Sequence, residues 1–230
     1  MTVILLDEIL LDGGRFYAET NPDYWIVEPW NAISSLTFFV PVFYWYHKLK
    51  NRFFEYPFLT YCMPLMFLGG LGSTLYHAFR ASSFLETLDV LPILILTASL
   101  SIFLWIKILP HWWYIFLLII PYFLLRQLVF SHIPSSYTTN MDYLLRGITM
   151  FLPAYLLLKK MNYRDAYLLG MVVFFFTLAL CFRYLDQTLA CWMYMGSHWL
   201  WHIFTSIGSF YLAEFLYRVE GGQKDFKVIR

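Results

Sequence analysis

The stretch from Thr87 to Lys107, TLDVLPILILTASLSIFLWIK, decides the fold class. Its only charged side chains are Asp89 and Lys107. An apolar run of about 20 residues is long enough to cross a hydrocarbon core about 30 Å thick. Because no water reaches the backbone in that core, the run must satisfy its own hydrogen bonds as a helix. The stretch is therefore predicted to be a transmembrane helix.

Two similar runs precede this stretch and four follow it. Many Trp and Tyr residues lie at the ends of these runs, as in interfacial aromatic belts. The composition agrees, since 60% of the residues are hydrophobic and 13% are charged, roughly half the charge of a soluble domain. The net charge of +1 gives no reason to expect a nucleic-acid partner. We predict an all-α integral membrane protein with one domain, 1–230, and seven helices at approximately 30–48, 57–79, 87–107, 110–130, 141–159, 165–184 and 197–218.

The distribution of Lys and Arg predicts the orientation in the membrane. The loops after the first and fifth runs and the C-terminal tail are rich in cations, namely Lys48, Lys50, Arg52, Lys159, Lys160, Arg164, Arg218, Lys224, Lys227 and Arg230. The opposite side has fewer, namely Arg15, Arg80, Arg126 and Arg183. We therefore expect the C-terminus in the cytoplasm and the N-terminus outside, which agrees with an odd number of spans.

This topology places several polar side chains at one membrane depth. His77 and Ser73 fall at the outer end of the second helix, and Asp89 falls near the outer start of the third. His198 and His202 fall in the first turns of the seventh. Ionisable residues inside a membrane span are costly and usually functional. Their common depth predicts one site.

The histidine spacing indicates the chemistry of that site. His198 and His202 are four residues apart, so both imidazoles leave one face of a helix and suit a single zinc ion. With His77 as the third ligand, the fourth position is open for water, as in catalytic zinc sites. Ser73 faces the same side as His77, and Asp89 is placed to orient a ligand or exchange protons with water. Taken alone, the His198–His202 pair also fits interfacial residues or haem ligands.

The remaining histidines, His47, His111 and His132, are predicted to be solvated residues near the membrane surface. The three cysteines, Cys62, Cys181 and Cys191, form no C-x-x-C pair, and their odd number argues against a disulfide framework. They are predicted to be small buried hydrophobes.

A second polar cluster precedes the first run and contains Glu19, Asn21, Asp23 and Glu28. Hard carboxylate and amide oxygens at short spacing suit Ca²⁺, although the segment lacks the ligand spacing and glycine of an EF-hand. The alternative is a solvated acidic segment that complements the dipole of the following helix.

Three segments resemble the alkaline ceramidase family: YAETNPDYWIVEPWNAISSLTF at 17–38, GGLGSTLYHAFRASSFLETLDVLP at 69–92, and FRYLDQTLACWMYMGSHWLWHIFTSIGSFY at 182–211. This family lies within a superfamily of seven-helix membrane hydrolases that also includes the progestin/adipoQ-type receptors. The motifs cover about a third of the chain, in the family's order. They are most similar to prokaryotic members, which have an E-P-x-N-A beginning and a G-S/T-H-x-L-W-H ending.

The resemblance implies an amidase that cleaves ceramide-like N-acyl sphingolipids into a sphingoid base and a fatty acid. It implies zinc on His77, His198 and His202, and assisting roles for Ser73 and Asp89. It also implies calcium at Glu19, Asn21 and Glu28, with Asn31 in the same motif. One calcium ligand of animal members is missing where this chain reads Phe16-Tyr17-Ala18, and Asp23 is the available substitute. The family's N-terminal cysteine is absent too, which leaves Cys191 without that partner.

In the leading hypothesis, Asp89 takes a proton from water and delivers it to the leaving amine, while Ser73 hydrogen-bonds the developing oxyanion. The lipid substrate enters from the bilayer. Two alternatives stay open: a non-catalytic lipid-sensing receptor with structural zinc, and a hydrolase of another acyl lipid. The chain has no N-x-S/T site and no evident retention signal. A bacterial inner membrane is therefore favoured over the endoplasmic reticulum or Golgi membrane.

Overall fold

The structure is a computed structural model that describes residues 14–133 and 135–226, and every regular element in these ranges is helical. The prediction of an all-α chain is confirmed. In chain order the elements are α1 (Pro29–Ser35), η1 (Leu36–Phe38), α2 (Phe39–Leu49), η2 (Phe53–Glu55), α3 (Pro57–Phe79), α4 (Ser83–Ile108), η3 (Trp112–Ile115), α5 (Phe116–Phe130), α6 (Ser135–Lys160), α7 (Ala166–Leu189) and α8 (His198–Phe226).

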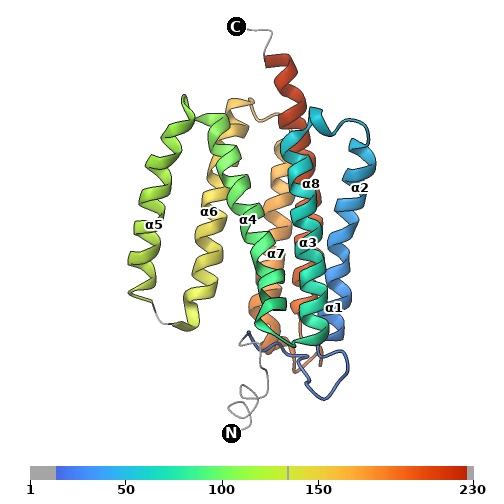
Figure 1. Ribbon diagram of the computed structural model, residues 1–230. Coiled ribbons are helices and arrows are strands. Elements are labelled where there is room, and N and C mark those ends of the chain that lie inside the picture. The colour runs from blue at the N-terminus through green and yellow to red at the C-terminus, as the bar shows by residue number, and fades with distance from the viewer. Residues whose placement is uncertain (1–13, 134, 227–230) are drawn as a thin grey trace. The chain divides into compact units, whose positions relative to one another are not determined.

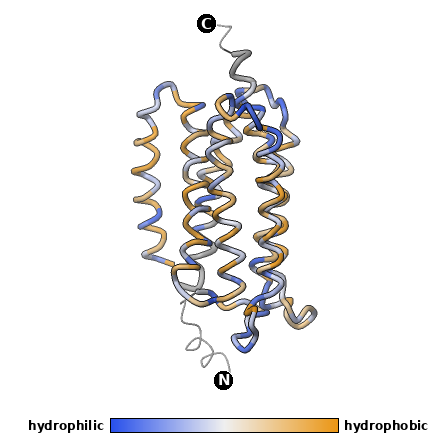
Figure 2. Tube along the Cα trace, turned by 45° about the vertical axis from the view of Figure 1, so that its right-hand side comes forward, coloured by the Kyte–Doolittle hydropathy of each residue, from blue (hydrophilic) through white to orange (hydrophobic). Residues whose placement is uncertain are grey.

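Among the residues that the structure describes, four helical segments are long and apolar enough to cross a membrane, and they indicate a multi-pass membrane protein. These segments are α3, α4, Trp112–Phe130 and α7. The predicted run 57–79 coincides with α3, whereas α4, α6, α7 and α8 each extend beyond the predicted boundaries. Figure 2 shows that hydrophobic residues predominate along the helices and that hydrophilic residues gather in the segments that join them, which is why the apolar runs predict helices.

The first predicted run, 30–48, is divided into α1, η1 and α2, although the backbone stays right-handed across the junctions. Pro41 lies in α2 and has no amide hydrogen to give to the carbonyl of Thr37 one turn earlier. The Ser206 hydroxyl of α8 donates to that Thr37 carbonyl instead, at 2.7 Å. The proline thus creates an acceptor by which α8 is fixed to the start of α2.

The described chain divides into two compact units. The first unit comprises the residues up to Leu94 and those from Tyr167 onward. In it α1 packs against α3 and α8, α2 packs against α3 and α8, and α3 also contacts α8. Aromatic pairs such as Phe175 with Phe204 join α7 to α8. Figure 1 shows the C-terminal end of α3 and the N-terminal ends of α1 and α8 at the same end of this unit.

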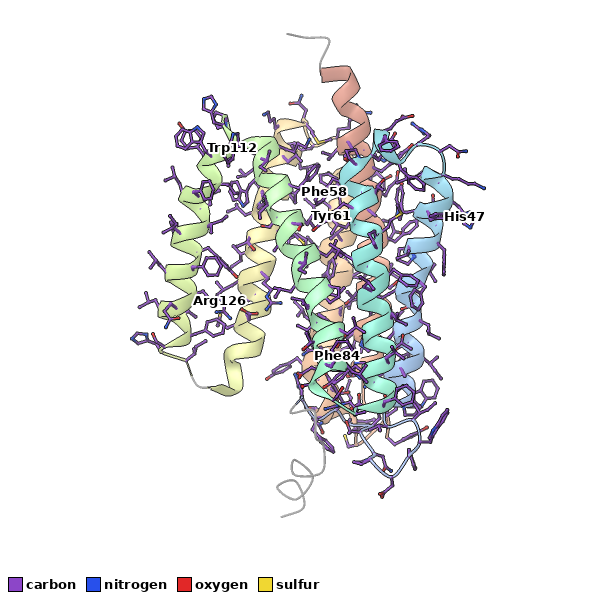
Figure 3. All side chains as sticks on the ribbon, in the orientation of Figure 1. His47, Phe58, Tyr61, Phe84, Trp112 and Arg126 are labelled. Carbon is purple, nitrogen blue, oxygen red and sulfur yellow. The ribbon has the colours of Figure 1, made fainter. Side chains whose placement is uncertain are left out.

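The second unit, Ile95–Ala166, contains the rest of α4 with η3, α5 and α6. The Ser101 hydroxyl of α4 donates to the Thr149 carbonyl of α6. Arg126 of α5, labelled in Figure 3, donates from Nε to the Asp142 carboxylate of α6 at 3.1 Å. No residue of α5 is buried, and most of its apolar side chains are exposed.

Candidate metal centre

Three buried histidines converge where α3 ends and α8 begins. His77 lies in the last turn of α3, and His198 and His202 lie in the first two turns of α8. All three are at most 2% exposed, and one ligand atom from each lies within 4.8 Å of the others. Among the described residues this is the only group of three or more His, Cys, Asp or Glu side chains that could hold a metal ion. The predicted convergence of these histidines is confirmed.

The end of α3 is held by the segment before α1. The amides of Val27 and Glu28 donate to the carbonyls of Ala78 and His77, at 2.9 and 3.0 Å. These carbonyls lie past the point where helical amides could reach them. Arg80 then ends the helix in the left-handed conformation, with φ of 46°. The backbone of His77 is therefore fixed on both sides.

The start of α8 is held by a carboxylate from α7. Asp186 is 1% exposed, and its Oδ1 accepts the amides of Ser197 at 2.8 Å and His198 at 2.9 Å. These are unpaired first-turn donors, and a buried carboxylate satisfies them while complementing the positive end of the helix dipole. Asp186 therefore sets the position of the His198 backbone.

The imidazole of His77 is oriented by Glu28. Its Nδ1 contacts the Glu28 carboxylate, which also forms an ion pair with Arg80 and accepts the Thr20 hydroxyl. Burial alone would raise the pKa of Glu28, but His77, Arg80 and Thr20 hold it below its ordinary value. An ionised Glu28 accepts a hydrogen bond from Nδ1–H of His77. The Nε2 atom of His77 is then left for a metal, as with carboxylate partners in other metal sites.

The imidazole of His202 is oriented by two serines of α1. The hydroxyls of Ser34 and Ser35 lie 2.9 and 3.2 Å from its Nδ1. The Ser34 hydroxyl is also within reach of the Asn31 carbonyl, at 3.0 Å. If the Ser34 hydroxyl donates its hydrogen bond to that carbonyl, its oxygen is left to accept a hydrogen bond from Nδ1–H of His202. Nε2 of His202 is then available to a metal.

Ser73 and Asp89 adjoin this network. Ser73 is 2% exposed; it accepts a hydrogen bond from Ser35 at 3.0 Å and is itself hydrogen-bonded to the Asp89 carboxylate. Gly72 makes this possible, because a Cβ at its position would lie 2.2 Å from the Leu88 carbonyl oxygen. The start of α4 can therefore approach α3 closely. The structure brings both predicted residues beside the histidines.

The acidic cluster before α1 is used differently from the calcium prediction. The two carboxylate oxygens of Glu19 accept the amides of Trp30 at 3.0 Å and Asn31 at 2.6 Å, which satisfies first-turn donors of α1. Burial raises the pKa of Glu19 to about 7, although these two amides oppose the shift. The carboxylate therefore complements a helix terminus, as the alternative interpretation expected, but it is buried and not solvated.

The other predicted calcium ligands do not gather around Glu19. Asn21 accepts the amide of Asp23 in a local turn, at 3.0 Å, and the Asp23 side chain is exposed. Glu28 turns toward His77 and Arg80. Within the ranges that the structure covers, these acids form no group of three that could hold a metal. Calcium binding stays a prediction.

Several side chains around the three histidines were not predicted from the sequence. Tyr17, Ser34, Ser35, Arg80 and Asp186 all support the histidines, yet each looks ordinary in its own segment. The one usable signal was the Ser34–Ser35 pair inside an otherwise apolar run, one turn after Asn31.

The outlying histidines and cysteines gave mixed results. The prediction of exposed histidines at His47, His111 and His132 is confirmed. Figure 3 shows His47 on α2, far from the C-terminal end of α3, which we call the metal end of the first unit. The prediction of buried cysteines holds for Cys62 and is wrong for Cys181 and Cys191, which are exposed. Cys181 lies on an outward face of α7 and Cys191 lies in the loop before α8.

Comparison with known proteins adds no relative to this geometry. No protein-family model matches the chain. No curated protein matches it significantly.

Proposed function

We propose that this chain is a zinc-dependent intramembrane amidase of the alkaline ceramidase type, which hydrolyses ceramide-like N-acyl sphingolipids to a sphingoid base and a fatty acid. The proposal includes seven spans, with α1–η1–α2, α6 and α8 crossing the membrane in addition to the four apolar segments. It also includes an outer N-terminus and a cytoplasmic C-terminus, most readily in a bacterial inner membrane.

The observation that carries the proposal is the buried His77–His198–His202 group with Ser73 and Asp89 beside it. Two of the three imidazoles have Nδ1 engaged by protein groups, so their Nε2 atoms are left for a metal. A purely structural site has no need for the additional Ser73–Asp89 pair.

The donor set fits zinc. Neutral imidazole nitrogens are preferred zinc ligands, and three protein ligands leave the fourth position that catalytic sites keep open. Zinc bound by His77, His198 and His202 would supply Lewis acidity, which activates water and polarises a carbonyl.

Asp89 and Ser73 provide the proton transfers. Asp89 takes one proton from the attacking water as the new C–O bond forms at the amide carbon, and gives it to the amine nitrogen as the C–N bond breaks. The second water proton stays on the new acid group until the C–N bond has broken, and then passes to the free amine, so the products are a carboxylate and a protonated amine.

Ser73 has one hydroxyl proton, which it shares with Asp89 before the reaction. When Asp89 takes up the water proton, it becomes a weaker acceptor. The Ser73 proton can then turn to the oxyanion on the former carbonyl oxygen. The hydrogen bond from Ser35 holds the Ser73 oxygen in place during this exchange.

The test is His198→Ala in purified full-length protein, with His47→Ala as the matched control because His47 is exposed and far from the site. Bound metal is measured, and turnover of a fluorescent ceramide is followed with and without chelator. We expect His198→Ala to lose both metal and turnover while His47→Ala keeps both. Full turnover by metal-free protein would defeat the proposal.

A screen of other lipids separates the alternatives. Wild-type protein that binds zinc and cleaves neither ceramide nor any other N-acyl lipid or phospholipid would favour the receptor. Turnover confined to another acyl lipid would keep the amidase or esterase chemistry and change the substrate.

A further inference from the structure

The three histidines of the metal centre are oriented unequally. His77 has a carboxylate on Nδ1 and His202 has hydroxyls on Nδ1. His198 is different, because its buried Nδ1 has no hydrogen-bond partner in the described part of the chain. A metal ligand whose ring is free to rotate binds its ion less tightly, because the rotation must be frozen on binding.

Tyr17 lies flat against the His198 ring. The two ring centroids are 3.9 Å apart and the planes differ by 22°, which is a stacked arrangement. The same tyrosine meets His77 edge-on, with centroids 5.3 Å apart. The Tyr17 ring is 6% exposed, so it is a fixed wall of the site. Stacking of this kind restrains the tilt of a ring without a hydrogen bond.

The segment that carries Tyr17 is anchored to the same carboxylate that anchors His198. Asp186 accepts the amide of Ala18 through Oδ2 at 2.9 Å, while its Oδ1 accepts the His198 amide. The stacked ring and the stacked ligand are therefore positioned from one buried group.

Neighbouring contacts hold this segment from other sides. The Arg80 guanidinium donates to the Arg15 carbonyl at 3.0 Å, and Gln187 donates to the Phe16 carbonyl at 3.1 Å. Gly196 has φ of 62°, and a Cβ there would lie 2.4 Å from the Cβ of Ala18. The chain before α8 can thus pass directly beside the Tyr17 segment only with glycine at this position.

We infer that Tyr17 is the positioning residue for His198: its ring, held by the Asp186 junction, takes the place of the hydrogen bond that orients the other two ligands. The inference rests on the proposed metal site and goes beyond it, because it assigns a role in metal affinity to the N-terminal segment. The proposed role belongs to the aromatic face of Tyr17, which Tyr17→Phe keeps.

The test compares Tyr17→Ala with Tyr17→Phe in the full-length protein in detergent, and zinc affinity is measured against a chromophoric chelator. Tyr56→Ala is the matched control, because Tyr56 is equally buried, stacks on Tyr217 at 4.5 Å, and lies at the opposite end of α3. We expect zinc affinity to fall about 10-fold or more in Tyr17→Ala, the size usual for residues that orient a ligand. Tyr17→Phe and Tyr56→Ala should stay within about twofold of wild type, since the first keeps the ring and the second leaves the site intact.

Cobalt(II) provides a second readout that a general loss of stability would not move. The visible absorption of Co²⁺ bound in place of zinc reports ligand geometry, and we expect it to change in Tyr17→Ala and to return to the wild-type form in Tyr17→Phe. Tyr17→Leu serves if Tyr17→Ala does not fold, because it keeps apolar volume and removes the planar face.

Two results would overturn the inference in distinguishable ways. Wild-type zinc affinity and cobalt spectra in both Tyr17→Ala and Tyr17→Leu would overturn it alone. Wild-type protein that takes up neither zinc nor cobalt would overturn the proposed metal chemistry together with it.

Discussion

The two ends of the first unit stabilise the same pair of helices, α3 and α8, by different means. At the metal end, a buried Glu28 is bound by His77 and Arg80, and Asp186 caps the start of α8. At the other end, Glu220 of α8 accepts the amides of Phe58 and Leu59 at 3.0 and 2.9 Å and so caps the start of α3. Each helix therefore begins on a carboxylate from another helix.

The charged groups at the two ends are used differently. At the end opposite the metal centre, Lys48 pairs with Glu214 at 2.8 Å and lies 4.4 Å from the ring centroids of Trp45 and Tyr217. Lys48 and Glu214 are only partly buried and satisfy each other. At the metal end, two imidazoles are oriented by protein groups through one nitrogen while the other is left for a ligand. Buried side chains with a nitrogen left for a ligand are typical of a binding site, whereas side chains that pair only with one another stabilise the fold.

The largest expected effect that would test this difference is that of Glu28→Gln. The change removes the charge that balances buried Arg80 and the acceptor that orients His77. We expect a loss of about 3–5 kcal/mol in the free energy of unfolding and a fall of roughly 10–100-fold in zinc affinity. Thermal unfolding in detergent and chelator competition measure the two. Unchanged zinc affinity would show that Glu28 does not orient a ligand.

A pH titration tests the role of Glu19 at the same end. Its pKa in the folded protein is raised from 4.5 to about 7, so between these values the folded state binds more protons than the unfolded state. The contribution of Glu19 to the free energy of unfolding should therefore be greatest below pH 4.5. It should fall by at most about 3 kcal/mol as the pH rises through 7. Melting temperatures from pH 5 to 8 in calcium-free buffer measure the slope.

Glu19→Gln is the control for this titration and should remove that part of the slope. Added calcium should reduce the wild-type slope if the predicted calcium site binds, because the ion favours the carboxylate. Equal slopes in wild type and Glu19→Gln would count against the raised pKa.

Gly72→Ala tests whether close approach of α3 and α4 serves the site. The new Cβ would meet the Leu88 backbone, so the start of α4 must shift and carry Asp89 away from Ser73. We expect a loss of about 1–3 kcal/mol in stability and a fall of up to about 100-fold in turnover, with zinc still bound. Gly170→Ala in α7 is the matched control, since nothing lies within 4 Å of its Cβ position. Full turnover in Gly72→Ala would show that the position of Asp89 beside Ser73 is not needed for catalysis.

The smallest effect is expected from Glu214→Gln at the opposite end. Its partners Lys48 and Arg218 are partly exposed and keep contact with solvent. We expect a change of at most about 1 kcal/mol in stability and no change in zinc affinity. If this substitution were as damaging as Glu28→Gln in both measurements, the two ends would not differ as described.

Much of the fold was predictable because hydrophobicity and chain length act locally. Apolar residues alone predict the runs that form α3 and α4, and the expected alternation of direction from span to span predicts that His77, His198 and His202 lie near one another, as the structure shows. The pair of histidines four residues apart needed only the period of a helix. Helix ends were placed less well, as α8 shows by running to Phe226.

What the sequence by itself determined about this protein is that it is a helical membrane protein with three histidines at one end, because periodicity and hydropathy are properties of neighbouring residues. Only the tertiary structure decided that Glu28 contacts His77, that Ser34 and Ser35 face His202, and that Tyr17 stacks on His198. Each of these pairs joins residues that are 49 or more positions apart in the sequence. Such pairings depend on how helix ends are rotated and capped, and no local pattern encodes that.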